Sequence, residues 1–148
     1  MRAEVIVSPA EFGCHDLTGK TAVVIDVFRF TTTVLTALEA GVERFYPVAE
    51  IEDAWALKKS HPNYLLAGER QSLKIEGFDF GNSPLEHYGK CHSGGALVCS
   101  TTNGTRAIHG ARGSQEIVLA CLRSAKAVAR YVREQGRDVV FFPAGLRG

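Results

Sequence analysis

The chain has 148 residues, of which 45% are hydrophobic and 22% are charged, and its formal net charge is +1. These values are typical of a globular protein that is long enough to bury a core of its own. The near-zero net charge argues against a global field for nucleic acid or a membrane surface, so any anion site must arise from a local arrangement of residues.

No apolar stretch approaches the roughly 20 residues that a membrane span needs. The N-terminal residues 1–7 resemble a strand and not a signal peptide. Cys14, Cys91, Cys99 and Cys121 form no CxxC pair, which favours reduced thiols over a disulfide framework. We therefore expect a cytoplasmic protein without a nucleic-acid or membrane partner.

Short apolar runs alternate with helical patterns along the chain. The expected elements, in chain order, are strand Ala3–Val7, strand Thr21–Asp26, helix Thr32–Ala40, strand Glu43–Val48, helix Ile51–Ser60, strand Tyr64–Ala67, a helical turn after Ser83 with capping-box spacing to Glu86, strand Ala96–Cys99, helix Thr105–Ala111, strand Glu116–Ala120, helix Ala125–Gln135 and strand Asp138–Phe142. This alternation predicts an α/β fold with a mostly parallel sheet covered by helices.

No linker, repeat or low-complexity tract interrupts the chain, so we expect a single α/β domain over residues 1–148. The last strand is followed by only a few residues, whereas a parallel strand normally returns through a helix. We therefore expect the chain to be the N-terminal part of a longer protein. Apolar sheet edges left uncovered there favour a homo-oligomer.

The strongest chemical feature is the segment Val23–Thr33, in which a hydrophobic strand ends at Asp26 and is followed by Arg29 and three threonines. Ligands of open α/β sheets bind outside the carboxyl ends of the strands. The next helix offers free N–H groups to an anion, and Arg29 can clamp its oxygens. The alternative is structural, with Thr31 or Thr32 as an N-cap and Asp26 paired with Arg29.

A long segment rich in charge and glycine, residues 68–84, follows the fourth expected strand. Long loops of compact domains are often binding loops. Its carboxylates at Glu69, Glu76 and Asp79 are candidate ligands for a hard cation, and Arg70 and Lys74 are candidates to face substrate anions. The alternative is a solvated surface loop.

A second hydroxyl-rich turn, Ser100–Arg106, again follows a strand and precedes a helix. Its small residues and Gly104 allow the backbone to approach an oxyanion closely. Cys99 precedes this turn, but six residues separate it from Arg106, one more than thiolate phosphatases have, and no adjacent basic residue would lower its pKa. We interpret Cys99 as a buried strand residue and not a nucleophile.

Three segments together resemble the 2-phosphosulfolactate phosphatase family in order and spacing: residues 23–33, Gly68-Glu-Arg with Lys74–Pro84, and residues 100–106. The resemblance runs through essentially the whole chain and implies a three-layer α/β/α sandwich. It also implies Mg²⁺-dependent hydrolysis of 2-phosphosulfolactate to 3-sulfolactate and phosphate, a step of coenzyme M biosynthesis. Family members are longer, and Phe28, Phe30 and Ser100 replace the more usual residues.

The resemblance implies a small phosphorylated, sulfonated hydroxy acid as substrate and Mg²⁺ as cofactor. Asp26 and Arg29 would be catalytic. Asp26 would bind the metal, with Glu69 or Asp79 assisting, or would attack phosphorus itself. The implied substrate-binding residues are Thr31, Thr32, Arg70, Lys74, Asn82, Ser83, Ser100, Thr101, Thr102, Asn103, Gly104, Thr105 and Arg106. Two alternatives stay open: another phosphorylated hydroxy acid as substrate, and a non-catalytic anion-binding module.

Overall fold

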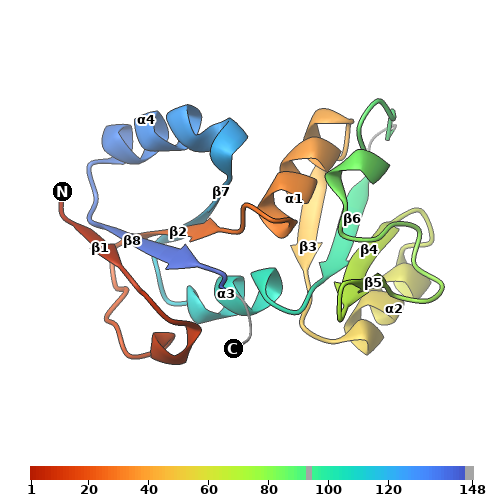
Figure 1. Ribbon diagram of the computed structural model, residues 1–148, viewed down its shortest axis with the longest axis horizontal. Helices are drawn as coiled ribbons and strands as arrows, with labels where there is room; N and C mark the ends of the chain where they lie inside the picture. The colour runs from red at the N-terminus through yellow and green to blue at the C-terminus, as the bar shows by residue number, and fades with distance from the viewer. Residues whose placement is uncertain (93–94, 146–148) are drawn as a thin grey trace.

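The strands of this protein form two four-stranded sheets in a computed structural model, which describes residues 1–92 and 95–145 (Figure 1). Sheet A has the order β1 (Ala3–Val5), β8 (Val139–Pro143), β2 (Thr21–Ile25) and β7 (Glu116–Ala120), and its strand pairs are parallel. Sheet B has the order β3 (Arg44–Pro47), β6 (Ala96–Ser100), β4 (Leu65–Arg70) and β5 (Leu73–Lys74), with only β5 antiparallel.

Among the described residues, four α-helices and three short 3₁₀ turns connect these strands. They are η1 (Pro9–Glu11), α1 (Phe30–Glu39), α2 (Ile51–Ser60), η2 (Pro84–Glu86), α3 (Gly104–Gly110), η3 (Leu122–Ser124) and α4 (Ala125–Gln135). Within the described residues, no helix has the length and apolar character needed to cross a membrane.

Three buried clusters show how the layers are stacked. The largest packs α1 and α3 between the inner faces of the two sheets, through Ala22, Val24, Val140 and Phe142 of sheet A, Phe30, Val34, Ala37, Ala107 and Ile108 of the helices, and Ala67, Leu97 and Cys99 of sheet B. The outer face of sheet A, at Val23 and Val139, packs on Val132 of α4. The outer face of sheet B, at Leu66 and Val98, packs on Ala54 of α2.

Figure 1 shows α4 and α3 on opposite sides of sheet A, and α1 beside sheet B. Each sheet lies between helices, and the buried cluster that contains α1 and α3 joins the two sheets. The expected α/β class and parallel pairing are confirmed. The division into two sheets was not predicted, because strands buried on both faces have the same residue pattern in either sheet.

The β4–β5 hairpin is an element that the sequence pattern missed. Its two-residue turn, Gln71 and Ser72, has φ values of 51° and 65°, the left-handed conformations of a type I′ turn. Such turns are recognised in sequence by Asn and Gly, and this one has neither. The turn extends β4 to Arg70, beyond the predicted end at Ala67.

The helical turn after Ser83 forms at the expected place, but without the expected capping box. The Ser83 side chain makes no capping hydrogen bond. The Glu86 carboxylate instead accepts the Gly81 N–H at 2.9 Å, so it stabilises the preceding loop. The helix expected over Ala125–Gln135 is confirmed, and Gly136 closes it with φ 67°, the usual left-handed C-cap.

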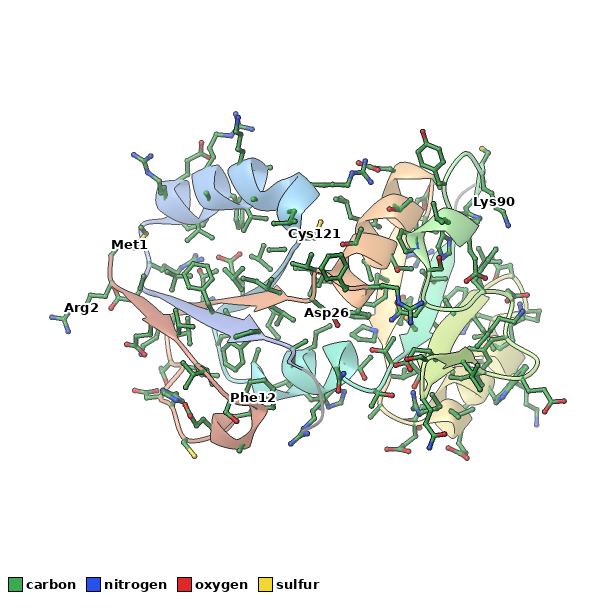
Figure 2. All side chains as sticks on the ribbon, viewed as in Figure 1. Met1, Arg2, Phe12, Asp26, Lys90 and Cys121 are labelled. Carbon is green, nitrogen blue, oxygen red and sulfur yellow. The ribbon has the colours of Figure 1, made fainter. Side chains whose placement is uncertain are left out.

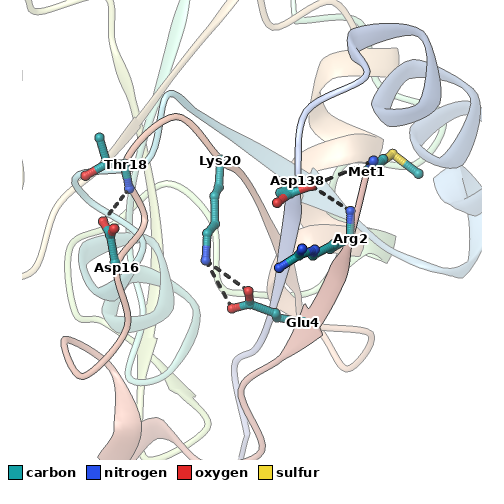
Figure 3. A network of polar contacts seen from close by, with 7 residues as sticks. All are labelled: Met1, Arg2, Glu4, Asp16, Thr18, Lys20 and Asp138. Atoms are coloured by element: carbon teal, nitrogen blue, oxygen red, sulfur yellow. Dashed lines mark hydrogen bonds and ion pairs between the residues drawn. The ribbon is translucent and has the colours of Figure 1, made fainter.

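Polar contacts fix the N-terminal strand to its neighbours (Figure 3). The Arg2 N–H donates to Asp138 at 2.6 Å, and the Lys20 ammonium lies 3.0 Å from a Glu4 carboxylate oxygen. These contacts hold β1 at the edge of sheet A beside β8.

Candidate active site

A cavity of about 940 Å³ opens at the carboxyl ends of strands from both sheets. It is lined by Asp26, Phe28, Arg29, Ala49, Glu50, Glu69, Arg70, Gln71, Ser72, Asn82, Thr101, Thr102, Asn103, Gly104, Thr105, Arg106 and His109. The three segments that the sequence singled out thus meet around one space, as expected for ligand sites at the carboxyl ends of parallel strands.

Asp26 lies directly after β2, between the two sheets (Figure 2). Burial raises the pKa of its carboxyl group, and the negative charge of Glu69 adds to this rise, against the backbone N–H of Phe30 and the charge of Arg29. No ion pair joins Asp26 to Arg29 within the described residues. Both side chains are therefore available to the cavity.

The hydroxyl groups of Thr31 and Thr32 face the backbone of the β2–α1 turn and do not line the cavity. Thr31 Oγ1 accepts the Asp26 N–H at 3.1 Å and lies within donating distance of the carbonyl oxygens of Asp26 and Ala120. Thr32 Oγ1 donates to the Val27 carbonyl at 2.9 Å. Neither is the N-cap, which is Arg29 without a side-chain bond. The two threonines hold the turn that positions Asp26.

Glu69 connects two loops of the cavity wall. Its carboxylate accepts the N–H groups of Ser72 and Thr102, each at 2.8 Å. Burial acts to raise the pKa of Glu69, but these N–H donors and the Arg70 charge outweigh it, so the pKa is lowered. Glu69 is therefore ionised at neutral pH and holds the β4–β5 turn against the β6–α3 turn.

Arg70 is held in place by hydrogen bonds. Its Nη2 donates to the Ser100 hydroxyl and to the Ala49 carbonyl, each at 2.8 Å, and its Nη1 donates to the Glu69 carbonyl at 2.9 Å. Ser100 itself is fully buried and does not line the cavity. Arg70 thus presents a fixed positive charge, and Ser100 serves to orient it.

The β6–α3 turn is shaped by its own hydroxyl groups. Thr105 Oγ1 donates to the Thr101 carbonyl at 2.6 Å, and Thr101 Oγ1 accepts the Thr105 N–H at 3.3 Å. Gly104 packs against the ring of Phe30, which occupies the space that a β-carbon would need. The side chains of Asn103 and Arg106 line the cavity.

Asn82 is 8% exposed and lines the cavity, and its Oδ1 has no hydrogen-bond partner within the described residues. A buried amide oxygen without a donor is costly unless a ligand or cation meets it. Together with the carboxylates of Asp26 and Glu69 it supplies three oxygen donors of the kind that Mg²⁺ prefers.

The structure does not bring Asp79, Lys74 or Ser83 to the cavity. The Asp79 carboxylate accepts the Leu66 N–H at 2.8 Å and lies 3.6 Å from Lys58 Nζ. It is therefore tied to the start of β4, at the end of the strand opposite the cavity. Within the described residues, no three His, Cys, Asp or Glu side chains gather into a metal-binding group.

The structure also shows where Cys99 lies, and it adds residues to the cavity wall that the sequence did not predict. Cys99 is buried in β6, as expected, and burial raises the pKa of its thiol to about 12. His109 lines the cavity, although nothing in its spacing distinguished it from the other histidines. Gln71 and Ser72 also line the cavity, and only the unpredicted hairpin brings them there.

Comparison with known proteins gives a consistent family. The family model for 2-phosphosulpholactate phosphatase matches residues 6–148. Proteins described as probable 2-phosphosulfolactate phosphatases are similar over most of the chain: 40% identity in Clostridium novyi (strain NT), 44% in Caldanaerobacter subterraneus subsp. tengcongensis and 42% in Clostridium tetani. The matches cover 100%, 90% and 100% of this chain, and 63%, 56% and 64% of those relatives. The chain thus spans about 60% of the length of these relatives.

Proposed function

The chain belongs to the 2-phosphosulfolactate phosphatase family, and from this premise we propose that it forms the phosphoryl-binding part of a phosphatase that hydrolyses 2-phosphosulfolactate to 3-sulfolactate and phosphate. The observation that supports the proposal best is the meeting of three separate segments around one cavity, with three acidic groups and three arginines in its wall. The proposed reaction supplies sulfolactate for coenzyme M biosynthesis.

The positive charges of the wall suit a substrate with several anionic groups. Phosphate, sulfonate and carboxylate oxygens each accept hydrogen bonds from guanidinium groups, often two at a time. In the proposal, Arg29 and the turn at Thr101–Thr105 hold the phosphoryl group, and Arg70 and Arg106 meet the sulfonate and carboxylate. The fixed position of Arg70 reduces the entropy lost when the substrate binds.

Mg²⁺ is the proposed cofactor, and Asp26, Glu69 and Asn82 are the residues that would hold it. Their three oxygen donors fit a hard cation, and the raised pKa of Asp26 is the mark of a buried carboxylate near a second negative charge. Bound there, the ion would supply positive charge next to the phosphoryl oxygens. Asp79, the other ligand expected from the sequence, takes no part in this proposal.

Asp26 has a second possible role, as the group that attacks phosphorus. A carboxylate nucleophile attacks phosphorus and breaks its bond to the alcohol oxygen, so that 3-sulfolactate leaves and an acyl phosphate forms, which water then hydrolyses to phosphate and the free carboxylate. The half-buried position of Asp26 at the head of α1 suits either role. We favour the metal ligand because Asp26 shares the cavity with Glu69 and with the unpartnered Asn82 oxygen.

The test is phosphate release from 2-phosphosulfolactate, with Mg²⁺ and with excess chelator, for this chain and for a version extended to the length of its relatives. We expect release that depends on Mg²⁺ and is fastest with the extended version. Full activity in chelator would contradict the metal assignment. A panel of other phosphorylated hydroxy acids tests the substrate, since a better one would replace 2-phosphosulfolactate.

A non-catalytic anion-binding role is the second candidate, because the chain spans only about 60% of the length of the relatives it matches. It predicts saturable binding of inorganic phosphate without turnover, even in the extended version. Turnover by the extended version would exclude a purely anion-binding role.

A further inference from the structure

Arg70 lies across the carboxyl ends of three neighbouring strands of sheet B. It is the last residue of β4, Ser100 is the last residue of β6, and Ala49 follows shortly after β3. The strands lie in the order β3, β6, β4 (Figure 1). The guanidinium group bonds both Ser100 and Ala49, so it reaches over the end of β6 towards β3. Both Arg70 and Ala49 line the cavity of the candidate active site.

The hydrogen bonds of Arg70 leave few of its donors free. A guanidinium group has five N–H donors. Nη2 donates to the Ser100 hydroxyl and to the Ala49 carbonyl, each at 2.8 Å, and Nη1 donates to the Glu69 carbonyl at 2.9 Å. Two N–H groups therefore remain for a ligand in the cavity. They match the two oxygens of a carboxylate better than the three oxygens of a sulfonate or a phosphoryl group.

The positive charge of Arg70 has no ion-pair partner within the described residues. The three acceptors that hold the side chain are neutral oxygens. Ser100 is fully buried, and its hydroxyl in turn donates to the Ala49 carbonyl at 3.2 Å. A guanidinium group that is held in one position and keeps its charge is a preformed receptor for an anion.

The position of Arg70 favours the carboxylate of the substrate over the sulfonate. In the proposed function, the turn at Thr101–Thr105 holds the phosphoryl group. Glu69, the residue before Arg70, accepts the Thr102 N–H of this turn at 2.8 Å, so the end of β4 lies beside the turn. In 2-phosphosulfolactate the carboxylate is attached to the carbon that carries the phosphate ester, and the sulfonate is attached one carbon further away. The acid group nearer to the phosphoryl group is therefore the carboxylate.

We propose that Arg70 is the receptor for the substrate carboxylate, that Ser100 is the residue that positions it, and that this pair restricts the site to phosphate esters of 2-hydroxy acids. The sulfonate is left to Arg106. The inference rests on the proposed function and deepens it, because it names the substrate group that the site requires. An ester without the carboxylate leaves the charge and the two free donors of Arg70 unmatched, and a site rejects such a ligand.

Phosphonates of matched length test the assignment without turnover. Three probes are titrated calorimetrically into the chain: 3-phosphonopropanoate, which carries a carboxylate; 2-phosphonoethanesulfonate, which carries a sulfonate in the same place; and propylphosphonate, which carries a methyl group there. We expect the carboxylate probe to bind about tenfold or more tightly than propylphosphonate, the equivalent of about 1.4 kcal/mol. It should also bind more tightly than the sulfonate probe, because only two donors of Arg70 are free.

Three variants locate the effect. Arg70→Gln should remove the advantage of the carboxylate probe over propylphosphonate, because the charge is lost. Ser100→Ala should reduce the advantage by about fivefold, and Ser100→Thr, which keeps the hydroxyl, should retain it. The affinity for propylphosphonate should change far less, which separates an effect on Arg70 from a general loss of structure. Arg130→Gln, on the exposed surface of α4, is the matched control and should change no affinity.

Equal affinities of the carboxylate and methyl probes would overturn the inference, as would a sulfonate probe that binds as tightly as the carboxylate probe. An advantage that survives Arg70→Gln would overturn it too, and so would binding of no probe. The proposed function is judged separately, by phosphate release from 2-phosphosulfolactate. Phosphate release without a carboxylate preference would keep the function and lose the role of Arg70. The preference without phosphate release from the extended version would keep the receptor and lose the function.

Discussion

Asp26 and Glu69 line the same cavity, but their surroundings move their pKa values in opposite directions. Burial and the neighbouring charge of Glu69 raise the pKa of Asp26. Two backbone N–H donors bring the pKa of Glu69 below its usual value despite burial. Ionisation of Asp26 therefore destabilises the folded state, whereas ionisation of Glu69 stabilises it. Of the two, Asp26 has the features expected of a functional group.

The change Asp26→Asn tests this assignment. We expect phosphate release to fall by about 10³-fold or more, because the amide can neither ligate Mg²⁺ as an anion nor attack phosphorus. The melting temperature should stay the same or rise, since a carboxylate that is costly to ionise has been removed. Asp16→Asn, in a surface loop, is the control. Near-normal phosphate release in the Asp26 variant would exclude both proposed roles.

His87 is fully buried beside Phe80, and its Nδ1 lies 3.0 Å from His92 Nε2. Burial, together with the charge of His92, lowers the pKa of His87 to about 4, and Lys90 acts in the same direction against Glu86. Between pH 6.5 and about 4 the unfolded chain binds a proton at this position and the folded chain does not. Stability therefore falls as the pH is lowered through this window.

We expect the free energy of unfolding to decrease by about 2–3 kcal/mol between pH 7 and pH 4 through His87. Urea titrations at several pH values measure it. His87→Gln should flatten the dependence within this window, and His15→Gln, at the surface, should leave it unchanged. An equally steep dependence in the His87 variant would assign the effect to other groups.

At the scale of elements, the two hydroxyl-rich turns are held together by the packing of one aromatic ring. Phe30, the first residue of α1, is fully buried and covers Gly104, the first residue of α3. The same ring lies 5.7 Å from that of Phe45 in β3. The Phe30 ring thus holds the turn that carries Asp26, after sheet A strand β2, against the turn that carries Thr101–Arg106, after sheet B strand β6.

Gly104→Ala tests this packing, because the new methyl group overlaps the Phe30 ring. We expect a loss of about 1–3 kcal/mol in stability, the usual range for overpacking, measured by urea unfolding. The double variant with Phe30→Leu should recover part of it by making room. Equal losses from Gly104→Ala with and without Phe30→Leu would show that the ring is not the obstacle.

Element-scale prediction succeeded where the signal is local. The strands and helices were located within a few residues because the central strands are short apolar runs, buried on both faces, and the helices repeat their apolar residues with a period near 3.6. The β4–β5 hairpin was missed because Gln71 and Ser72 adopt left-handed conformations, which Gln and Ser residues rarely adopt. The capping-box prediction at Ser83 was wrong because Glu86 is engaged by Gly81.

At the scale of the molecule, one buried cluster joins both sheets through α1 and α3. Val24 of sheet A and Leu97 of sheet B are both fully buried in it. If either sheet separated from α1 and α3, the buried residues of the other sheet in this cluster would be exposed as well. We infer that the described part of the chain unfolds as a single cooperative unit, although its strands form two sheets.

Calorimetry of Val24→Ala and Leu97→Ala tests this inference. Each change leaves a cavity in the shared core, and Leu97→Ala should cost about 2–5 kcal/mol. Both variants should show one transition, moved to lower temperature. Ala56→Gly, at an exposed position of α2 outside the shared core, is a control for a purely local loss. Two transitions, of which each variant moves only one, would show that the sheets unfold independently.

The sequence by itself determined the α/β class, most elements and the two strand-end turns that carry the hydroxyl groups, because these depend on residue patterns within a few positions. The family, too, was recognisable from three short segments. Only the tertiary structure decided that the strands form two sheets, that Glu69 joins the cavity of Asp26 and Asp79 does not, and that His109 lines this cavity. The reason is physical: these outcomes depend on which buried faces pack together, and strands buried on both sides have the same pattern wherever they lie.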